Sequence, residues 1–175
     1  MKEKIYIFDT TLRDGAQTHG VDFNVDEKKQ LAHKLDEIGV DYIEGGWPGA
    51  NSTDTQFFNE DLKFKSSKFT AFGMTKRSGR SAENDPGLAG LINTSADSIC
   101  IVGKSWDFHV DVALEISNEE NLDNIKQSVE FLASQRNEVH FDAEHFFDGF
   151  KSNPDYALSC LKSAYDAGAR WIVLC

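Results

Sequence analysis

Arg13 and Asp14 stand side by side directly after a short apolar run, Ile5 to Phe8, and Gly15 follows them. The run is typical of a buried parallel strand, and α/β proteins place their chemistry at the carboxyl ends of such strands. Asp14 offers the hard oxygen that Mg²⁺ or Mn²⁺ prefers. Arg13 is a permanent cation whose forked donors suit a carboxylate or a developing oxyanion. From the spacing alone, Arg13 and Asp14 could instead form an ordinary salt bridge at the end of the strand, with Gly15 in the turn that follows.

Two later strand ends carry further carboxylates. Glu44 lies near the end of an expected strand at 42–45, where it could orient Arg13, support a metal site, or face water as most glutamates do. In an expected strand at 139–143, alternation predicts a polar face of His140, Asp142 and Glu144 and a second face of Phe141, Ala143 and His145. Because helices cover both sides of a parallel sheet, polar residues there indicate a site rather than a solvated surface.

Three segments together resemble one enzyme family. They are Asp9 to Gln17 (DTTLRDGAQ), Tyr42 to Pro48 (YIEGGWP) and Phe141 to Gly149 (FDAEHFFDG). They are similar to the metal-dependent acyl-CoA condensing and cleaving barrels, a family that includes isopropylmalate, homocitrate and citramalate synthases and the hydroxymethylglutaryl-CoA lyases. The similarity runs in order through the whole chain and most resembles the citramalate synthase branch.

The resemblance implies a Claisen-type condensation in which the enolate of acetyl-CoA attacks the carbonyl of a 2-keto acid, most simply pyruvate to give citramalate. It implies a divalent metal (Mg²⁺, Mn²⁺ or Zn²⁺), acetyl-CoA as co-substrate, and a homodimer in the full-length protein. By residue-level match Asp14 is a metal ligand, Arg13 stabilises a negative substrate oxygen, and Glu44 holds Arg13. Glu144 positions the substrate, and Gln17 and His145 lie at the pocket edge.

The sequence also departs from the family's pattern. The family completes its metal site with a His-x-His pair on strand seven, and no such pair occurs among the five histidines here. One carboxylate makes a poor metal site, since affinity rests on several converging ligands. A catalytic base is not identifiable, and Ala16 stands where many relatives carry a glutamate. We therefore expect the isolated 175-residue chain to be inactive or very weak, and full turnover by it would contradict this expectation.

Strand and helix patterns alternate along the chain with a period of about 30 residues, which predicts an α/β fold, a (β/α)₈ TIM barrel truncated within strand six. Residues 1–175 are expected to be the N-terminal part of the catalytic barrel, with strands seven and eight and any C-terminal regulatory domain absent. The expected strands are 5–8, 42–45, 69–72, 98–102, 139–143 and 171–175, and the expected helices are 25–38, 54–62, a third from 84–86, 121–135 and 153–167.

Two of these helices carry specific signals. Asn24 and Glu27 form a capping-box pattern before the helix at 25–38, and Gly39 is a plausible stop. Apolar stripes predict which sides of the two helices are buried: Leu31, Leu35 and Ile38 in the first, and Leu158, Leu161 and Tyr165 in the last.

The amino-acid composition argues against nucleic-acid and membrane partners and for a reducing compartment. Lys and Arg number 18 and Asp and Glu 29, so the net charge is −11, which argues against a nucleic-acid partner. No apolar run is long enough for a membrane span or a signal peptide, which predicts no membrane partner. Three scattered cysteines, each expected to be a small buried residue, fit a reducing cytoplasm.

Anionic coenzyme A would need a local basic patch in so acidic a protein. Lys76, Arg77 and Arg80 follow the third expected strand and could supply one, or they could be an ordinary solvated cluster. His109, after the fourth strand, could face a pocket, although a lone histidine is more often structural.

Several functions stay open from sequence alone. They are a citramalate synthase, an isopropylmalate or homocitrate synthase, a lyase that cleaves the corresponding carbon–carbon bond, and a non-catalytic fragment or split subunit whose open strand edges pair with a partner chain. The volume of a pocket discriminates between 2-keto acids by only about 1–3 kcal/mol of binding free energy per methylene, and the sequence does not fix that volume.

Overall fold

The computed structural model describes residues 4–175, which form two compact units. Within this described range, the N-terminal unit comprises residues 4–72 with Asn93–Ser98, and the C-terminal unit comprises Gly73–Ile92 with Ile99–Cys175. Among the described residues, no helix is long and apolar enough to cross a membrane.

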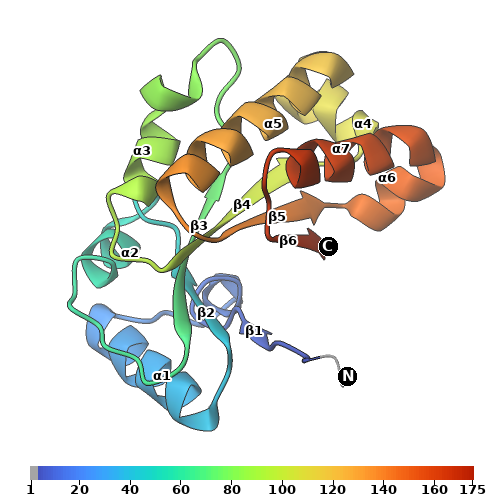
Figure 1. Ribbon diagram of the computed structural model, residues 1–175. Helices are drawn as coiled ribbons and strands as arrows, with labels where there is room; N and C mark the ends of the chain where they lie inside the picture. The colour runs from blue at the N-terminus through green and yellow to red at the C-terminus, as the bar shows by residue number, and fades with distance from the viewer. Residues whose placement is uncertain (1–3) are drawn as a thin grey trace. The chain divides into compact units, whose positions relative to one another are not determined.

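Strands and helices alternate along the chain (Figure 1). The strands are β1 (Phe8–Asp9), β2 (Tyr42–Gly46), β3 (Lys68–Met74), β4 (Ser98–Lys104), β5 (Val139–Glu144) and β6 (Trp171–Leu174). The α-helices are α1 (Val25–Ile38), α2 (Ser52–Phe57), α3 (Pro86–Ile92), α4 (Asp107–His109), α5 (Asn118–Gln135), α6 (Phe146–Ser152) and α7 (Pro154–Asp166). Short 3₁₀ turns, η1 (Gly15–Gln17) and η2 (Ala82–Asn84), and a π-helical turn, η3 (Val110–Leu114), complete the elements.

Strand pairing is parallel in both units, as the alternation predicts. In the N-terminal unit β2 pairs with β1 and with β3, and the register shifts between Glu44 and Gly46. In the C-terminal unit β5 lies between β4 and β6. Helix α1 packs on β2, and α5 and α7 lie side by side (Figure 1). Such parallel β/α units place the strand ends, and the polar residues on them, at one edge of each sheet.

The first strand differs from expectation. The predicted buried strand at 5–8 is wrong in position and burial, since β1 spans only Phe8–Asp9 and Ile5 is 86% exposed. Within the described residues of the N-terminal unit, β1 pairs with β2 alone, so a strand neighbour covers it on one side only. Cys175, which follows β6, is likewise exposed, whereas Cys100 and Cys160 are buried as predicted.

Helix α1 confirms the predicted bounds and caps but not the predicted buried side. Asn24 and Glu27 form the reciprocal capping box, and Gly39 ends the helix in the left-handed conformation. Ile38 of the predicted stripe is 78% exposed, and Leu31 and Leu35 are only half-buried. Lys28, Ala32 and Asp36 are the buried residues of this helix. Two charged side chains turn inward because each meets a full set of partners inside the unit.

Other element bounds shift where a polar cap decides them. Helix α2 begins at Ser52 instead of Asp54, because the Asn51 side chain accepts a hydrogen bond from the Asp54 backbone N–H. Helix α5 begins at Asn118 because Ser117 caps it in the same way. Strand β3 and strand β4 both extend two residues further than predicted, to Met74 and Lys104.

The C-terminal helices revise two expectations. Helix α7 starts at Pro154 as predicted, but Leu158 and Tyr165 are 48% and 69% exposed, and the small residues Ala157, Cys160 and Ala164 are buried instead. Helix α7 packs against α5 and α6 and against strands β5 and β6. Helix α6 is not foreseen by the sequence pattern, since seven residues are too few for a clear helical period.

Asp36 anchors a loop of the N-terminal unit. Its carboxylate accepts hydrogen bonds from the backbone N–H groups of Lys65, Ser66 and Ser67, at 2.8, 3.1 and 2.9 Å. Burial alone would raise the pKa of Asp36, but the three N–H donors outweigh burial and hold the pKa well below its usual range. The ionised form is therefore the one that stabilises the fold.

We predict that Asp36→Asn lowers the free energy of unfolding by about 2 kcal/mol at pH 7, because it removes charge-assisted hydrogen bonds. A pKa lowered by folding contributes stability above the unfolded-state pKa of about 4, and that contribution is lost as pH falls through the folded-state pKa. Urea unfolding at several pH values should show the gap between wild type and variant closing below about pH 4. Glu130→Gln, at an exposed ion pair with Lys126, is the control and should change stability by less than about 0.5 kcal/mol. A gap that persists at low pH would contradict the electrostatic explanation.

Candidate active site

A buried ion pair joins the first two strand ends of the N-terminal unit. Arg13 Nε donates to Glu44 Oε2 at 2.7 Å, and the two side chains are 16% and 1% exposed. An ionised carboxylate this deeply buried is stable only beside a cation. The sequence-based expectation that Glu44 orients Arg13 therefore corresponds to a direct contact.

Two further contacts fix the Arg13 guanidinium. Its Nη1 donates to Asp14 Oδ1 at 3.0 Å, and its carbon lies 4.0 Å from the centre of the Phe72 ring. Trp47 packs edge-on against Phe72, with ring centres 5.7 Å apart. A guanidinium held in plane by carboxylates and from one face by an aromatic ring has little rotational freedom.

Asp14 lies on a tight turn after β1. The backbone N–H groups of Arg13, Asp14 and Gly15 all donate to the carbonyl oxygen of Thr10. This turn leaves the Asp14 side chain 63% exposed, and its Oδ2 accepts no hydrogen bond from the described part of the chain. Gln17 ends the following η1 turn and lines, together with Arg13, a cavity of about 330 Å³.

The donor set offers one ligand for a divalent metal rather than a complete site. Asp14 presents an exposed carboxylate oxygen of the type that Mg²⁺ and Mn²⁺ prefer. Within residues 4–175, no three His, Cys, Asp or Glu side chains are grouped so that they could hold a metal ion. Asp14 therefore fits the role of a single ligand, which agrees with the missing His-x-His pair.

A second buried ion pair, unforeseen from sequence, lies behind this cluster. The Lys28 ammonium binds the Asp54 carboxylate and donates to the carbonyl oxygens of Leu12 and Gly45 at 2.7 and 2.9 Å. Asp54 Oδ2 also accepts from the Trp47 backbone N–H at 2.8 Å. The signal in the sequence is a lysine that shares a helix face with Ala32 and Asp36, at four-residue spacing.

The C-terminal unit carries the predicted residues of β5. His140 and Asp142 are 1% and 8% exposed, which confirms a polar strand face that is covered rather than solvated. Glu144 forms an ion pair with Lys104 at the end of β4, and both side chains are half-buried. His145 follows in the left-handed conformation, with φ 53°, and its Nδ1 lies 3.0 Å from Asp148 Oδ2.

His109 is not a lone structural histidine. Its ring centre lies 4.6 Å from that of His145 and 4.7 Å from that of Trp106. Burial, then the neighbouring His145 and Lys104, lower the pKa of His109, so its imidazole is neutral at pH 7. Trp106, His109 and His145 therefore form one aromatic and imidazole cluster, and the charges of Lys104 and Glu144 act on the His109 imidazole.

The basic cluster at 76–80 is only partly available to a ligand. The Lys76 ammonium is buried and donates to Asn124 Oδ1 at 2.5 Å and to the Arg80 carbonyl oxygen at 2.9 Å. Arg77 and Arg80 are exposed. Lys76 thus shapes the loop, and the two arginines alone could meet an anionic group.

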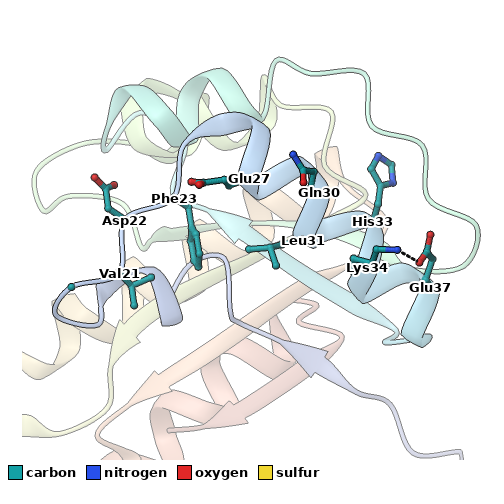
Figure 2. Close-up of a pocket in the computed structure, with 10 residues that line it drawn as sticks. Val21, Asp22, Phe23, Glu27, Gln30, Leu31, His33, Lys34 and Glu37 are labelled. Carbon is teal, nitrogen blue, oxygen red and sulfur yellow. Dashed lines mark hydrogen bonds and ion pairs between the residues drawn. The ribbon is translucent and has the colours of Figure 1, made fainter.

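A separate groove of about 850 Å³ lies along α1 and contains none of the predicted site residues. Val21, Phe23 and Leu31 form its apolar part, and Lys34 and Glu37 pair at one end (Figure 2). Volume alone does not make this groove the active site, because the convergent charges lie elsewhere in the unit.

Residues 4–175 match the model of the HMGL-like family. The chain belongs to the HMGL-like family. It is 52% identical to the (R)-citramalate synthase of Aquifex aeolicus over 100% of this chain and 34% of the relative, and 53% identical to that of Geobacter sulfurreducens over 98% and 33%. Identity to the 2-isopropylmalate synthase of Sulfolobus acidocaldarius is 34%, over 95% of this chain and 41% of the relative. The chain thus spans about a third of the length of the curated relatives, and the resemblance to the citramalate synthase branch is confirmed.

Solved structures show the same fold. The hydroxymethylglutaryl-CoA lyase of Pseudomonas aeruginosa matches with a TM-score of 0.75 at 14% identity, over 97% of this chain and 56% of that chain. The lyase of Bacillus subtilis matches with a TM-score of 0.71 at 14% identity, over 98% and 57%. The predicted TIM-barrel class of β/α units is thereby confirmed.

Two glycines with positive φ differ in the space around them, so replacing each with alanine tests how tightly the site is packed. A Cβ on Gly46 (φ 146°) would lie 2.5 Å from Asp54 Cγ, whereas a Cβ on Gly49 (φ 86°) would meet nothing within 4 Å. We predict that Gly46→Ala lowers the free energy of unfolding by about 3 kcal/mol, since it forces the buried Lys28–Asp54 pair to move. Gly49→Ala should cost only the backbone strain of about 1 kcal/mol. Equal losses in thermal unfolding would mean that the space beside Asp54 is not tight.

Proposed function

We propose that this chain is part of the catalytic barrel of an acyltransferase that condenses acetyl-CoA with pyruvate to give citramalate. The identity of about one half to (R)-citramalate synthases, over the whole chain, carries the proposal. The Arg13–Glu44–Asp14 cluster supports it, because a fixed guanidinium and an exposed carboxylate suit the oxygens of a 2-keto acid.

The reaction proceeds in two stages. The methyl group of acetyl-CoA loses a proton, and the enolate carbon forms a bond to the keto carbon, whose oxygen takes up a proton. Water then cleaves the thioester and releases coenzyme A. When bound, a divalent cation (Mg²⁺, Mn²⁺ or Zn²⁺) supplies Lewis-acid polarisation of the keto carbonyl.

The residues of this chain take distinct roles in the proposal. Arg13 stabilises the negative oxygen of the keto acid or enolate, because Glu44 and Asp14 hold its fork in advance at Nε and Nη1. Asp14 contributes one metal ligand. By the family resemblance, we assign Glu144, which pairs with Lys104, to substrate positioning, and we assign Gln17 and His145 to the pocket edge. The proton acceptor for the methyl group is not among these residues.

We also propose a cytoplasmic homodimer for the full-length protein. Cys100 and Cys160 are buried thiols, and reduced cysteines fit a reducing compartment. Light scattering after gel filtration of the full-length protein tests the dimer.

The decisive experiment measures coenzyme A release by the full-length protein. Acetyl-CoA is offered with pyruvate, 2-ketoisovalerate or 2-ketoglutarate, with Mg²⁺ or Mn²⁺ and then with a chelator. We expect chelator-sensitive release with pyruvate. A preference for another keto acid would replace the substrate in the proposal, and absence of release with all three would contradict a synthase.

A second prediction concerns the Arg13 fork. Arg13→Lys keeps the positive charge but loses the paired donors, so we expect kcat to fall by about 100-fold or more in the full-length protein. Arg170→Lys is the matched control, because Arg170 also lies over an aromatic ring, 4.5 Å from the centre of Trp171, but is exposed in the C-terminal unit. Equal activity of the two variants would remove Arg13 from the chemistry.

A further inference from the structure

The Lys28 ammonium makes three hydrogen bonds, and two of them go to the backbone on either side of the candidate active site. The carbonyl oxygen of Leu12, 2.7 Å away, belongs to the residue before Arg13. The carbonyl oxygen of Gly45, 2.9 Å away, belongs to the residue after Glu44. One ammonium therefore ties together the two backbone segments that carry the Arg13–Glu44 pair.

The third bond, to Asp54, connects the same ammonium to the aromatic side of the site. Asp54 Oδ2 accepts from the Trp47 N–H at 2.8 Å, and Trp47 packs against the Phe72 ring that lies under Arg13. The contacts thus reach the guanidinium by two routes, through the backbone and through the aromatic pair.

Burial makes this arrangement rigid. Lys28 is 2% exposed and Asp54 is 7% exposed, so water does not compete for their polar atoms. A lysine ammonium has three donors, and all three have acceptors here. Any displacement of the two backbone segments would leave a buried donor or acceptor unsatisfied, which is costly at low dielectric.

We infer that Lys28 is a positioning residue for the proposed reaction: through Leu12 and Gly45 it sets the separation at which Arg13 and Glu44 meet. This inference rests on the proposed function for its kinetic readout. In a purely structural role, the Lys28–Asp54 pair would contribute stability only. Removing the pair would then leave the Arg13–Glu44 geometry unchanged.

The test separates these roles with three variants of the full-length protein. Lys28→Met keeps the length of the side chain but leaves Asp54 as an unpaired buried carboxylate. The double variant Lys28→Met with Asp54→Asn removes that charge as well, so its melting temperature should recover most of the loss. Asp36→Asn is the control, because it weakens a buried anchor of the same unit that does not touch the site.

We expect kcat to fall by about 100-fold in both Lys28 variants, in line with the cost of displacing a positioned group by about 1 Å. The double variant should stay slow although its stability has recovered, and Asp36→Asn should keep its kcat although it is less stable. Recovery of kcat together with stability in the double variant would overturn the positioning role.

A spectroscopic readout is independent of turnover. The Nε–H signal of Arg13 in the ¹⁵N spectrum, assigned by its loss in Arg13→Lys, reports the hydrogen bond to Glu44. In both Lys28 variants this signal should move toward that of exposed arginines and exchange faster with water. An unchanged signal would overturn the inference, whether or not the wild type turns over any of the keto acids. Absence of turnover by the wild type would contradict only the proposed function.

Discussion

A carboxylate buried inside a sheet of apolar strands needs a cation within hydrogen-bonding distance, and this constraint organises the N-terminal unit. The Glu44 side chain is 1% exposed, and leaving it ionised without a partner would cost several kcal/mol. Arg13 meets the requirement only because the turn after β1 brings its backbone beside the end of β2. The turn at Thr10 and the ring of Phe72 both serve that placement. The Arg13–Glu44 ion pair therefore both stabilises the fold of this unit and forms part of the candidate site.

The C-terminal unit contains a comparable but more exposed ion pair, in which the Lys104 and Glu144 side chains are 18% and 31% exposed. Glu144 pairs with Lys104, and the Lys104 carbonyl oxygen accepts from Asn121 Nδ2 at 2.9 Å and contacts Cys160 Sγ at 3.8 Å. Burial raises the pKa of Cys160 to about 12, so this thiol stays protonated and serves packing rather than nucleophilic chemistry. In each unit a buried polar side chain on a helix thus donates to a backbone carbonyl: Lys28 to that of Leu12, the residue before Arg13, and Asn121 to that of Lys104, which pairs with Glu144.

The features predictable from sequence are those with local causes. The capping box at Asn24 and the stop at Gly39 depend on residues within one helical turn, and both occur as predicted. The motif residues Arg13, Asp14 and Glu44 meet because parallel strands bring their carboxyl ends together. Long-range polar burial was not predictable in this way. Lys28 lies inward because of three acceptors on distant segments, and a hydropathy pattern that counts lysine as exposed assigns the wrong side of α1.

The same distinction applies to function. In the proposed function, Arg13, which Glu44 holds in place, and the metal ligand Asp14 act on oxygen atoms that every 2-keto acid carries, so these residues account for the reaction class. The choice between a methyl and a larger branch depends on apolar lining, where each methylene is worth only about 1–3 kcal/mol. Full-chain identity reflects that lining as well as the charged motif, and it is 52% to a citramalate synthase against 34% to a 2-isopropylmalate synthase. In the proposed function, the preference for pyruvate therefore rests on the residues around the charges, and the Claisen-type chemistry rests on the charges themselves.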